Sequence, residues 1–190
     1  MNGKSSSLSA LARTLRSVLA EETDLDDSQI VIGPPHEAAK QQEDATDKDY
    51  LCVFFYRMAY SGFPTDAVSD DPLYLNAHCL ITALGGRSGG KTPGDSELNL
   101  IGSVLEFFHR NSVLKVEDDD GNQMQLHIVP TQLTLDDINH LWVTQNNTPY
   151  RLSLAYEFAL LPVPMAVPVR EGPRVKEAIL KEVKSFERKS

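Results

Sequence analysis

Alternation of hydrophobic and polar residues predicts three long β-strands in the chain. The run 50–56 is apolar on both faces, which is typical of a central strand. In 73–83 and in 150–161, apolar residues occupy every second position, so one face of each strand is expected to be buried. The residues expected on the buried face of the last strand are Leu152, Leu154, Tyr156, Phe158 and Leu160.

Shorter strands complete the predicted sheet. A run of β-branched residues at 30–32 stops at the sequence Gly-Pro-Pro, which interrupts regular structure. Weaker strands are expected at 113–117 and 124–129. The sequence Asp-Asp-Asp-Gly-Asn at 118–122 lies between them and has the composition of a hairpin turn.

Apolar residues at helical spacing predict helices at 7–21, 96–110, 135–144 and about 174–188. The polar stretch 36–49 is expected to be an exposed loop or a weak helix. The buried stripes expected in the two middle helices are Leu98, Ile101, Leu105 and Phe108 in the first of them, and Ile138, Leu141 and Trp142 in the second.

Side chains that can cap a helix mark the starts of the two middle helices. Asp95 or Ser96 is expected to begin the earlier one. Thr134 can cap the later one, because its hydroxyl reaches the backbone three residues on while Asp137 bonds back to it.

The order of these elements predicts an α+β fold, with a mostly antiparallel sheet flanked by helices. We expect one such domain over 1–161. Prolines recur in 162–173 and exclude a central strand there, so this segment is expected to be an extended connector. Residues 174–190 would then form a detached C-terminal arm with an amphipathic helix.

Composition is that of an ordinary globular protein, with 41% hydrophobic and 24% charged residues in 190. The formal net charge of −9 argues against nucleic acid as the main partner, because phosphate binding requires a basic surface. Residues 170–190 carry seven Lys/Arg and four Asp/Glu, or +3, which leaves −12 for the rest of the chain. The basic arm could dock on an acidic surface, such as a neighbouring copy, or be a solvated helix.

Cys52 and Cys79 lie inside apolar strand-like runs, which favours buried thiols in a reducing compartment over a disulfide framework. No signal-peptide core is evident in 1–9, and no stretch approaches the ~20 apolar residues that span a bilayer. We therefore expect synthesis and assembly in the cytoplasm, without direct membrane insertion.

The segment from Gly85 through Gly90 and Lys91 to Thr92 matches the phosphate-binding loop pattern G-x-x-x-x-G-K-[ST]. That loop requires its Lys and Thr in the first helical turn, where backbone N–H groups surround the phosphates. Pro93 follows directly and disfavours a helical conformation at Thr92, so the helix is expected to begin too late. A glycine-rich connection without a cofactor is the favoured interpretation, and nucleotide binding is the alternative.

Other chemical sites are weakly indicated. The five histidines are scattered, with no pair at the spacing of metal ligands, so no metal site is expected. The acidic run 118–122 lacks the spaced ligands of a calcium loop and is expected to be a solvated turn. No nucleophile motif is present either, and the sequence does not predict an enzyme.

Several segments together carry a resemblance to a known family: 72–83, 97–105, 129–130, 141–142 and 147–157. The most specific element is a tryptophan followed by Asn-x-Pro-Tyr-Arg-x-Ser-Leu-x-Tyr. Over about 8–161 the chain resembles the tail terminator, or cap, family of extracellular contractile injection systems, of the Photorhabdus virulence cassette and antifeeding prophage type.

This resemblance implies a structural subunit with a tail-terminator-like fold. It would form a homo-hexameric ring on the last inner-tube and sheath rings and would end tube growth at the end distal to the baseplate. A baseplate or tube adaptor of the same machine is the alternative within this class. Trp142, Tyr150 and Tyr156 are expected to be core and loop anchors rather than direct contacts.

Closed rings require contacts between different surfaces of neighbouring copies, and extended arms often supply them. The arm helix is expected to dock on another chain, although it could also fold back on its own domain. Arg151 and Glu157 share the polar face of their strand and could pair with each other or across a subunit boundary. The interface candidates are Arg57, Arg151, Glu157, Val175, Ile179, Val183 and Phe186.

Overall fold

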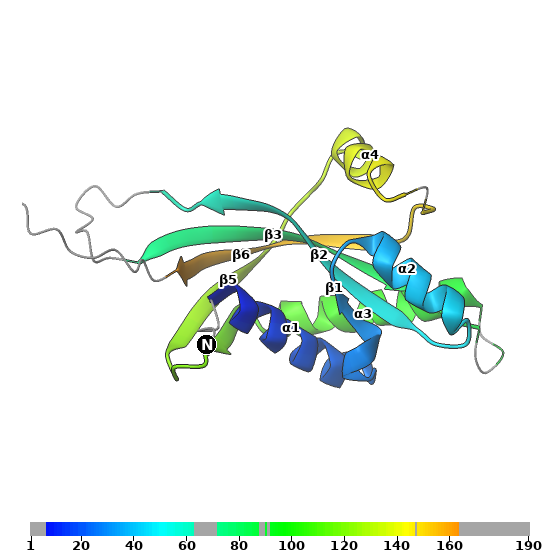
Figure 1. The fold of residues 1–190 in the computed structure, drawn as a ribbon, viewed down its shortest axis with the longest axis horizontal. Coiled ribbons are helices and arrows are strands. Elements are labelled where there is room, and N and C mark those ends of the chain that lie inside the picture. Colours follow the sequence, from blue (N-terminus) through cyan, green and yellow to red (C-terminus); the bar gives the residue numbers. More distant parts are fainter. Residues whose placement is uncertain (1–6, 63–71, 88–89, 91, 147, 164–190) are drawn as a thin grey trace, which may run out of the picture.

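The structure is a computed structural model that describes residues 7–62, 72–87, 90, 92–146 and 148–163. Within these residues helices and strands alternate irregularly along the chain (Figure 1). The elements are α1 (Ser7–Thr23), a 3-10 helix (Asp27–Gln29), β1 (Ile30–Ile32), α2 (Pro35–Asp44), β2 (Tyr50–Tyr60), β3 (Leu73–Leu84), α3 (Pro93–Arg110), β4 (Val113–Glu117), β5 (Gln123–Pro130), α4 (Leu135–Val143) and β6 (Ser153–Val163).

A single sheet with the strand order β1-β2-β3-β6-β5-β4 forms the centre of the molecule. All neighbouring strands are antiparallel except β1 and β2, which run parallel. The predicted α+β fold with a mostly antiparallel sheet is therefore confirmed. The predicted hairpin is also present, since β4 and β5 pair in register from Val113 opposite His127 to Glu117 opposite Gln123.

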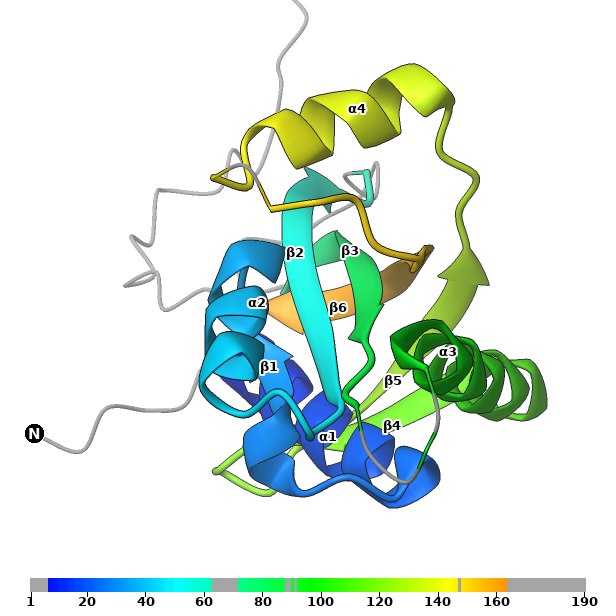
Figure 2. The ribbon, with the colours of Figure 1, turned by 90° about the vertical axis from the view of Figure 1, so that its right-hand side faces the viewer.

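Helices cover both faces of this sheet (Figures 1 and 2). α1 and α3 pack on one face and bury the main hydrophobic core with β2, β3, β5 and β6. α2 covers part of the opposite face, where Ala38 packs against Tyr50, Cys52 and Leu84. α4 also lies over this second face but stands away from the sheet, as Figure 2 shows. Cys52 and Cys79 are buried and free, in agreement with the sequence.

Two strands contain an irregularity that changes which residues face the core. In β2 the register shifts between Phe55 and Arg57, which pair with Cys79 and His78. In β6 the register shifts where Leu160 adopts φ 65°, a left-handed conformation. The prediction that Leu160 faces the core was wrong, because the extra residue of this bulge places Leu161 in the core and leaves Leu160 43% exposed.

α3 differs from the prediction in its start and in its buried face. Thr92 is the N-cap and Pro93 is the first helical residue, so the predicted start at Asp95 or Ser96 was wrong. Proline favours an extended preceding residue, and this is the conformation of an N-cap, with ψ 154° at Thr92.

The buried stripe of α3 is also rotated from the predicted one. Leu98 and Leu105 are 63% and 45% exposed, so their assignment to the core was wrong. The residues actually buried are Ser96, Leu100, Ile101, Val104, Phe107 and Phe108. In the polar stretch 36–49, the weak-helix alternative holds, since α2 begins at Pro35 and buries Pro35 and Ala38.

Candidate interaction surface

α4 and the segment after it carry the most specific residues of the family resemblance. The predicted capping box is present: the Thr134 hydroxyl accepts from the Asp137 N–H at 3.2 Å, and the Thr134 N–H donates to the Asp137 carboxylate at 3.0 Å. Trp142 is only 8% exposed, whereas Leu135 and Val143 are 79% and 82% exposed. α4 therefore turns one side to the body and presents apolar residues at both of its ends to solvent.

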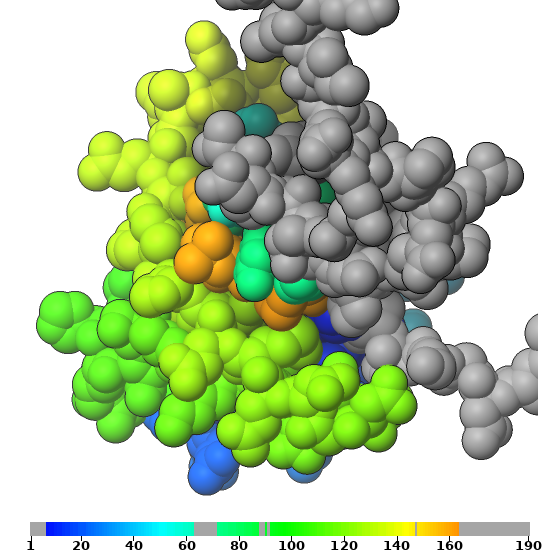
Figure 3. Space-filling view, turned by 90° about the vertical axis from the view of Figure 1, so that its left-hand side faces the viewer, coloured from blue at the N-terminus to red at the C-terminus, as the bar shows by residue number. Residues whose placement is uncertain are grey.

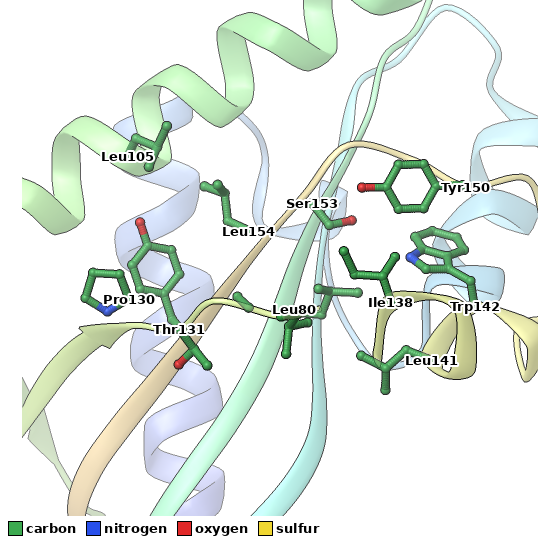
Figure 4. A pocket seen from close by; sticks show the side chains of 13 residues that line it. Leu80, Leu105, Pro130, Thr131, Ile138, Leu141, Trp142, Tyr150, Ser153 and Leu154 are labelled. Carbon is green, nitrogen blue, oxygen red and sulfur yellow. The ribbon is translucent and has the colours of Figure 1, made fainter. Parts of the chain in front are cut away.

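A groove of about 270 Å³ separates α4 from the sheet and α3 (Figure 4). Its lining is mostly apolar and comes from five elements and the loops beside α4. Residues from these elements that line it are Leu80 of β3, Leu105 of α3, Pro130 of β5, Ile138, Leu141 and Trp142 of α4, and Ser153, Leu154, Ala155 and Tyr156 of β6. The groove follows β6 where β5 has diverged, since β5 pairs with β6 only over Tyr156–Ala159 in the described chain.

Two aromatic residues with polar atoms form one wall of the groove. Trp142 and Tyr150 pack edge to face, with ring centroids 5.3 Å apart and an interplanar angle of 67°. The indole Nε1 of Trp142 is buried and has no hydrogen-bond partner. Figure 4 shows this nitrogen on the edge of the ring that faces Ile138, one turn earlier on α4, and the Tyr150 hydroxyl pointing inward. Buried N–H groups are normally paired, so this donor is suited to an acceptor that enters the groove.

The expectation that Trp142, Tyr150 and Tyr156 are anchors receives different support for each residue. Trp142 and Tyr156 are buried, and the ring of Tyr156 packs against Phe108 at 4.7 Å in an edge-to-face arrangement. Tyr150 is 56% exposed. It therefore holds Trp142 with one side of its ring and leaves the other side accessible.

A second hollow adjoins the groove beneath α4 and is lined by Arg57, one of the interface candidates, and by His78. Arg57 pairs with His78, and His78 pairs in turn with Glu157, so the three residues form a row across β2, β3 and β6. The bulge in β2 places Arg57 on this face. The His78 imidazole Nδ1 lies 3.6 Å from the Glu157 carboxylate. His78 was not among the interface candidates predicted from sequence, although its place among the polar residues of 73–83 put it on this face.

Arg151 does not line this hollow, and its ion-pair partner is not Glu157. Its guanidinium Nη1 bonds to the Glu97 carboxylate at 2.9 Å. Arg151 and Glu157 do not pair with each other in the structure. The Arg151–Glu97 contact instead ties the entry of β6 to the first turns of α3, and its partner could not be identified from sequence because it is 54 residues away.

The backbone N–H groups at the start of the glycine-rich segment already have hydrogen-bond acceptors within the protein, although a phosphate-binding loop would use such groups to bind phosphate. The N–H groups of Gly85, Gly86 and Arg87 donate to the Glu97 carboxylate at 3.3 Å, the Asp49 carboxylate at 2.6 Å and the Thr46 carbonyl at 2.8 Å. Two of these acceptors are carboxylates, whose charge would repel a phosphate.

The glycines at 85 and 86 are explained by close packing. A Cβ on Gly85 would lie 1.9 Å from the Pro93 carbonyl oxygen, and one on Gly86 would lie 2.6 Å from the backbone of Lys48. Thr92 caps α3, and its hydroxyl bonds to the Asp95 carboxylate at 2.7 Å. Gly90 has φ 76° with open space around it, and Lys91 lies outside the described residues.

The four arm candidates, Val175, Ile179, Val183 and Phe186, also lie outside the described residues. Among the residues that the structure does describe, no cluster of three His, Cys, Asp or Glu side chains has an arrangement that could hold a metal ion. No helix in the same part of the chain is long and apolar enough to cross a membrane.

Comparison with known proteins identifies the family. Residues 8–177 match the family described as the Pvc16 N-terminal domain, and the chain belongs to this family. A search of curated proteins found no match.

Two solved structures are similar to this chain. One is a PVC sheath/tube terminator of an extracellular contractile injection system, in the extended state, with a TM-score of 0.55 and 18% identity over 95% of this chain. The other is the tube-terminating cap of the anti-feeding prophage, with a TM-score of 0.48 and 18% identity over 91% of this chain. The present chain spans 64% of the length of the PVC terminator and 59% of that of the prophage cap. At this identity, the likeness to the PVC terminator shows a shared fold.

Proposed function

We propose that this protein is a structural cap, or tail terminator, of a contractile injection system. In this proposal it forms a homo-hexameric ring on the distal end of the inner tube and sheath and ends tube growth there. The protein is made in the cytoplasm and becomes part of a phage tail-like particle. Its partners are other copies of itself and the tube and sheath subunits, and it acts without nucleic acid, a cofactor or catalysis.

The observation that carries the proposal is the family match over residues 8–177, which includes α4 and the groove. The fold shared with a sheath/tube terminator supports the same role. The surface is also suited to protein contacts, because α4 presents the exposed apolar residues Leu135 and Val143 beside an apolar groove. The chain spans 64% of the terminator it resembles, so the role of the full-length relative is carried over as part of the proposal.

Immunogold electron microscopy of purified particles tests this proposal, with a strain deleted for the gene as the comparison. We expect label only at the end away from the baseplate and tubes of uncontrolled length in the deletion strain. A matched control strain expresses the deleted gene again and should recover uniform tube lengths. Uniform tubes in the deletion strain would contradict a role in termination.

An adaptor at the baseplate is the second candidate within the same machine. Label at the baseplate end in the same micrographs would establish the adaptor and overturn the cap.

Nucleotide binding is the remaining alternative, and it depends on Lys91. We expect Mg-ATP to leave the unfolding temperature of the protein unchanged, with Lys91→Ala as the comparison. The physical reason is that the N–H groups of Gly85 and Gly86 already donate to carboxylates. An ATP-dependent rise in unfolding temperature that disappears in Lys91→Ala would establish nucleotide binding instead.

A further inference from the structure

The groove beneath α4 differs from a packed protein interior in two respects, the filling of space and the pairing of buried polar groups. It is an apolar space of about 270 Å³ that remains open, and it contains a buried indole N–H without an acceptor. An apolar side chain would fill the first need, and a carbonyl or carboxylate oxygen would fill the second. The occupant must therefore bring both kinds of group together.

The end of an amphipathic helix brings both kinds of group. The last four carbonyl groups of a helix have no partner within the helix, so they are free acceptors. In the predicted arm helix at 174–188, Phe186 lies in the last turn on the same face as Val175, Ile179 and Val183. Its aromatic ring can pack against the exposed side of Tyr150 while a terminal carbonyl accepts from Trp142 Nε1.

Charge favours the same occupant. Residues 170–190 carry a net charge of +3, and the remainder of the chain carries −12. The hollow that adjoins the groove is lined by Asp137 and by Arg57, and a second carboxylate, that of Glu157, lies next to His78 in the row with Arg57. Lysine and arginine side chains of the arm can approach these carboxylates while its apolar face enters the groove.

The direction of β6 distinguishes the chain's own groove from that of a neighbour. The groove contacts Ser153–Tyr156, at the start of β6, and the described chain ends at Val163, at the other end of the strand. Figures 1 and 3 show this end of β6 on the side of the molecule away from α4. The distance between the two ends is about 30 Å at ~3.3 Å per residue. To return, residues 164–173 would have to reverse direction at once; their extended length of ~33–36 Å, with ~18 Å more for a helix from 174 to Phe186, covers the distance, but a neighbour placed head to tail is reached without that reversal.

We propose that the C-terminal arm of each copy, with Phe186 as its anchor, occupies the groove between α4 and β6 of the adjacent copy. The arm leaves one end of the body and the groove opens near the other, so the contact is head to tail. A head-to-tail contact generates a closed ring when the rotation that relates neighbouring copies closes around an axis. This inference rests on the proposed assembly of several copies into a ring and identifies the contact that would close it.

Photo-crosslinking in the full chain tests both the groove and the direction of exchange. Light chains with p-benzoylphenylalanine in place of Phe186 are mixed with isotopically heavy wild-type chains, as isolated protein and in purified particles. We expect crosslinks from light to heavy chains that map to peptides of α4 and of 148–156. The matched control places the same photo-reactive residue at Lys181, on the opposite face of the predicted helix, and should give little product in these peptides.

The pattern of crosslinks decides the inference. Crosslinks within a single light chain, recognised because the product keeps the mass of one chain, would show that the arm folds on its own body, and products outside the groove would identify another acceptor. Absence of crosslinks from both isolated protein and particles would also overturn the proposal. If crosslinks fail while immunogold label remains at the distal end, the terminator role stands without this contact. If crosslinks succeed with label at the baseplate, the contact stands in a different ring.

A second variant measures how much Phe186 contributes. Phe186→Asp should weaken the association of copies at least tenfold, because burial of a phenylalanine side chain contributes more than that factor. Ser185→Asp makes the same change in charge off the apolar face and should associate like the wild type. Sedimentation over a range of concentrations measures both. Equal association of the two variants would contradict the role of Phe186.

Discussion

Gly85 offers the sharpest test of what the glycine-rich segment does. A phosphate-binding loop needs glycine so that its backbone can approach a ligand, and its substitution would chiefly reduce ligand binding. In this structure the missing Cβ is explained by α3, because it would lie 1.9 Å from the Pro93 carbonyl oxygen. Gly85→Ala should therefore destabilise the fold itself.

The expected size follows from the contacts around Gly85. Real Cβ atoms essentially never approach closer than 3.0 Å, so the backbone at Pro93 would have to move by about 1 Å. Overpacking of this kind typically costs about 1–3 kcal/mol. The movement also disturbs the bonds from Gly85 N–H to Glu97 and from Gln42 to the Gly85 carbonyl, each contributing ~1 kcal/mol. We expect a loss of about 3–5 kcal/mol in the free energy of unfolding.

Urea unfolding followed by circular dichroism measures this loss, and Trp142 fluorescence provides an independent probe of the same transition. The matched control is Gly94→Ala, in the first turn of α3, where the new Cβ would have only the Thr92 hydroxyl at 3.9 Å. This variant should be neutral or more stable by up to about 1 kcal/mol, because alanine favours helix. A Gly85→Ala protein within ~0.5 kcal/mol of wild type would refute the packing explanation.

Three further predictions concern the core, the thiols and α4. Phe158 is fully buried and packs edge to face with Phe108. In urea unfolding, Phe158→Ala should lower the free energy of unfolding by about 3–5 kcal/mol and Phe158→Leu should lower it by under ~1.5 kcal/mol, so equal losses would contradict this packing. Burial raises the pKa of the Cys52 thiol to about 12 and also raises the pKa of the Cys79 thiol. Neither thiol should therefore react with Ellman's reagent at pH 8 until denaturant is added, and rapid labelling of the native protein would show that a strand opens. Hydrogen bonds from the Thr134 hydroxyl and backbone lower the pKa of Asp137, so its ionised form stabilises the start of α4 above the usual aspartate pKa, and this contribution is lost as the pH falls through the lowered value. Trp142 emission should change in the wild type as the pH falls below the usual aspartate pKa, and should change less in Asp137→Asn; identical titrations would exclude Asp137 as the cause.

Local chemistry made much of this fold predictable. The β4–β5 hairpin follows from alternation on both sides of an Asp-Gly turn, in which the Asp118 carboxylate accepts from the Asn122 N–H at 2.8 Å. The capping box of α4 follows equally from Thr134 and Asp137, because both partners lie within one turn. Such features depend only on residues close in sequence.

Features that depend on distant residues could not be predicted. The bulges of β2 and β6 arise from pairing with β3, and each reverses the alternation beyond it, which moved Leu160 out of the core and placed Arg57 beside His78. The buried face of α3 was missed because leucines occur on both sides of the helix, and packing against α1 and the sheet selects the one with Ile101. Pro93 was considered only as an obstacle to a helix at Thr92, although the same restriction makes Thr92 an N-cap.

α4 and the segment after it carry the residues that are most specific to the family resemblance, and few contacts with the rest of the described chain hold α4 in place. Helices of nine residues are unstable alone, so α4 depends on its cap and on the contact of Trp142 with Tyr150. Leu135 and Val143 remain exposed at its ends, and the groove beneath it is open. An apolar occupant would add contacts to the side of α4 that faces the sheet and would satisfy the Trp142 N–H. Occupation of the groove and the position of α4 are therefore coupled, and the surface of each copy would become complete only when a neighbour contributes to it.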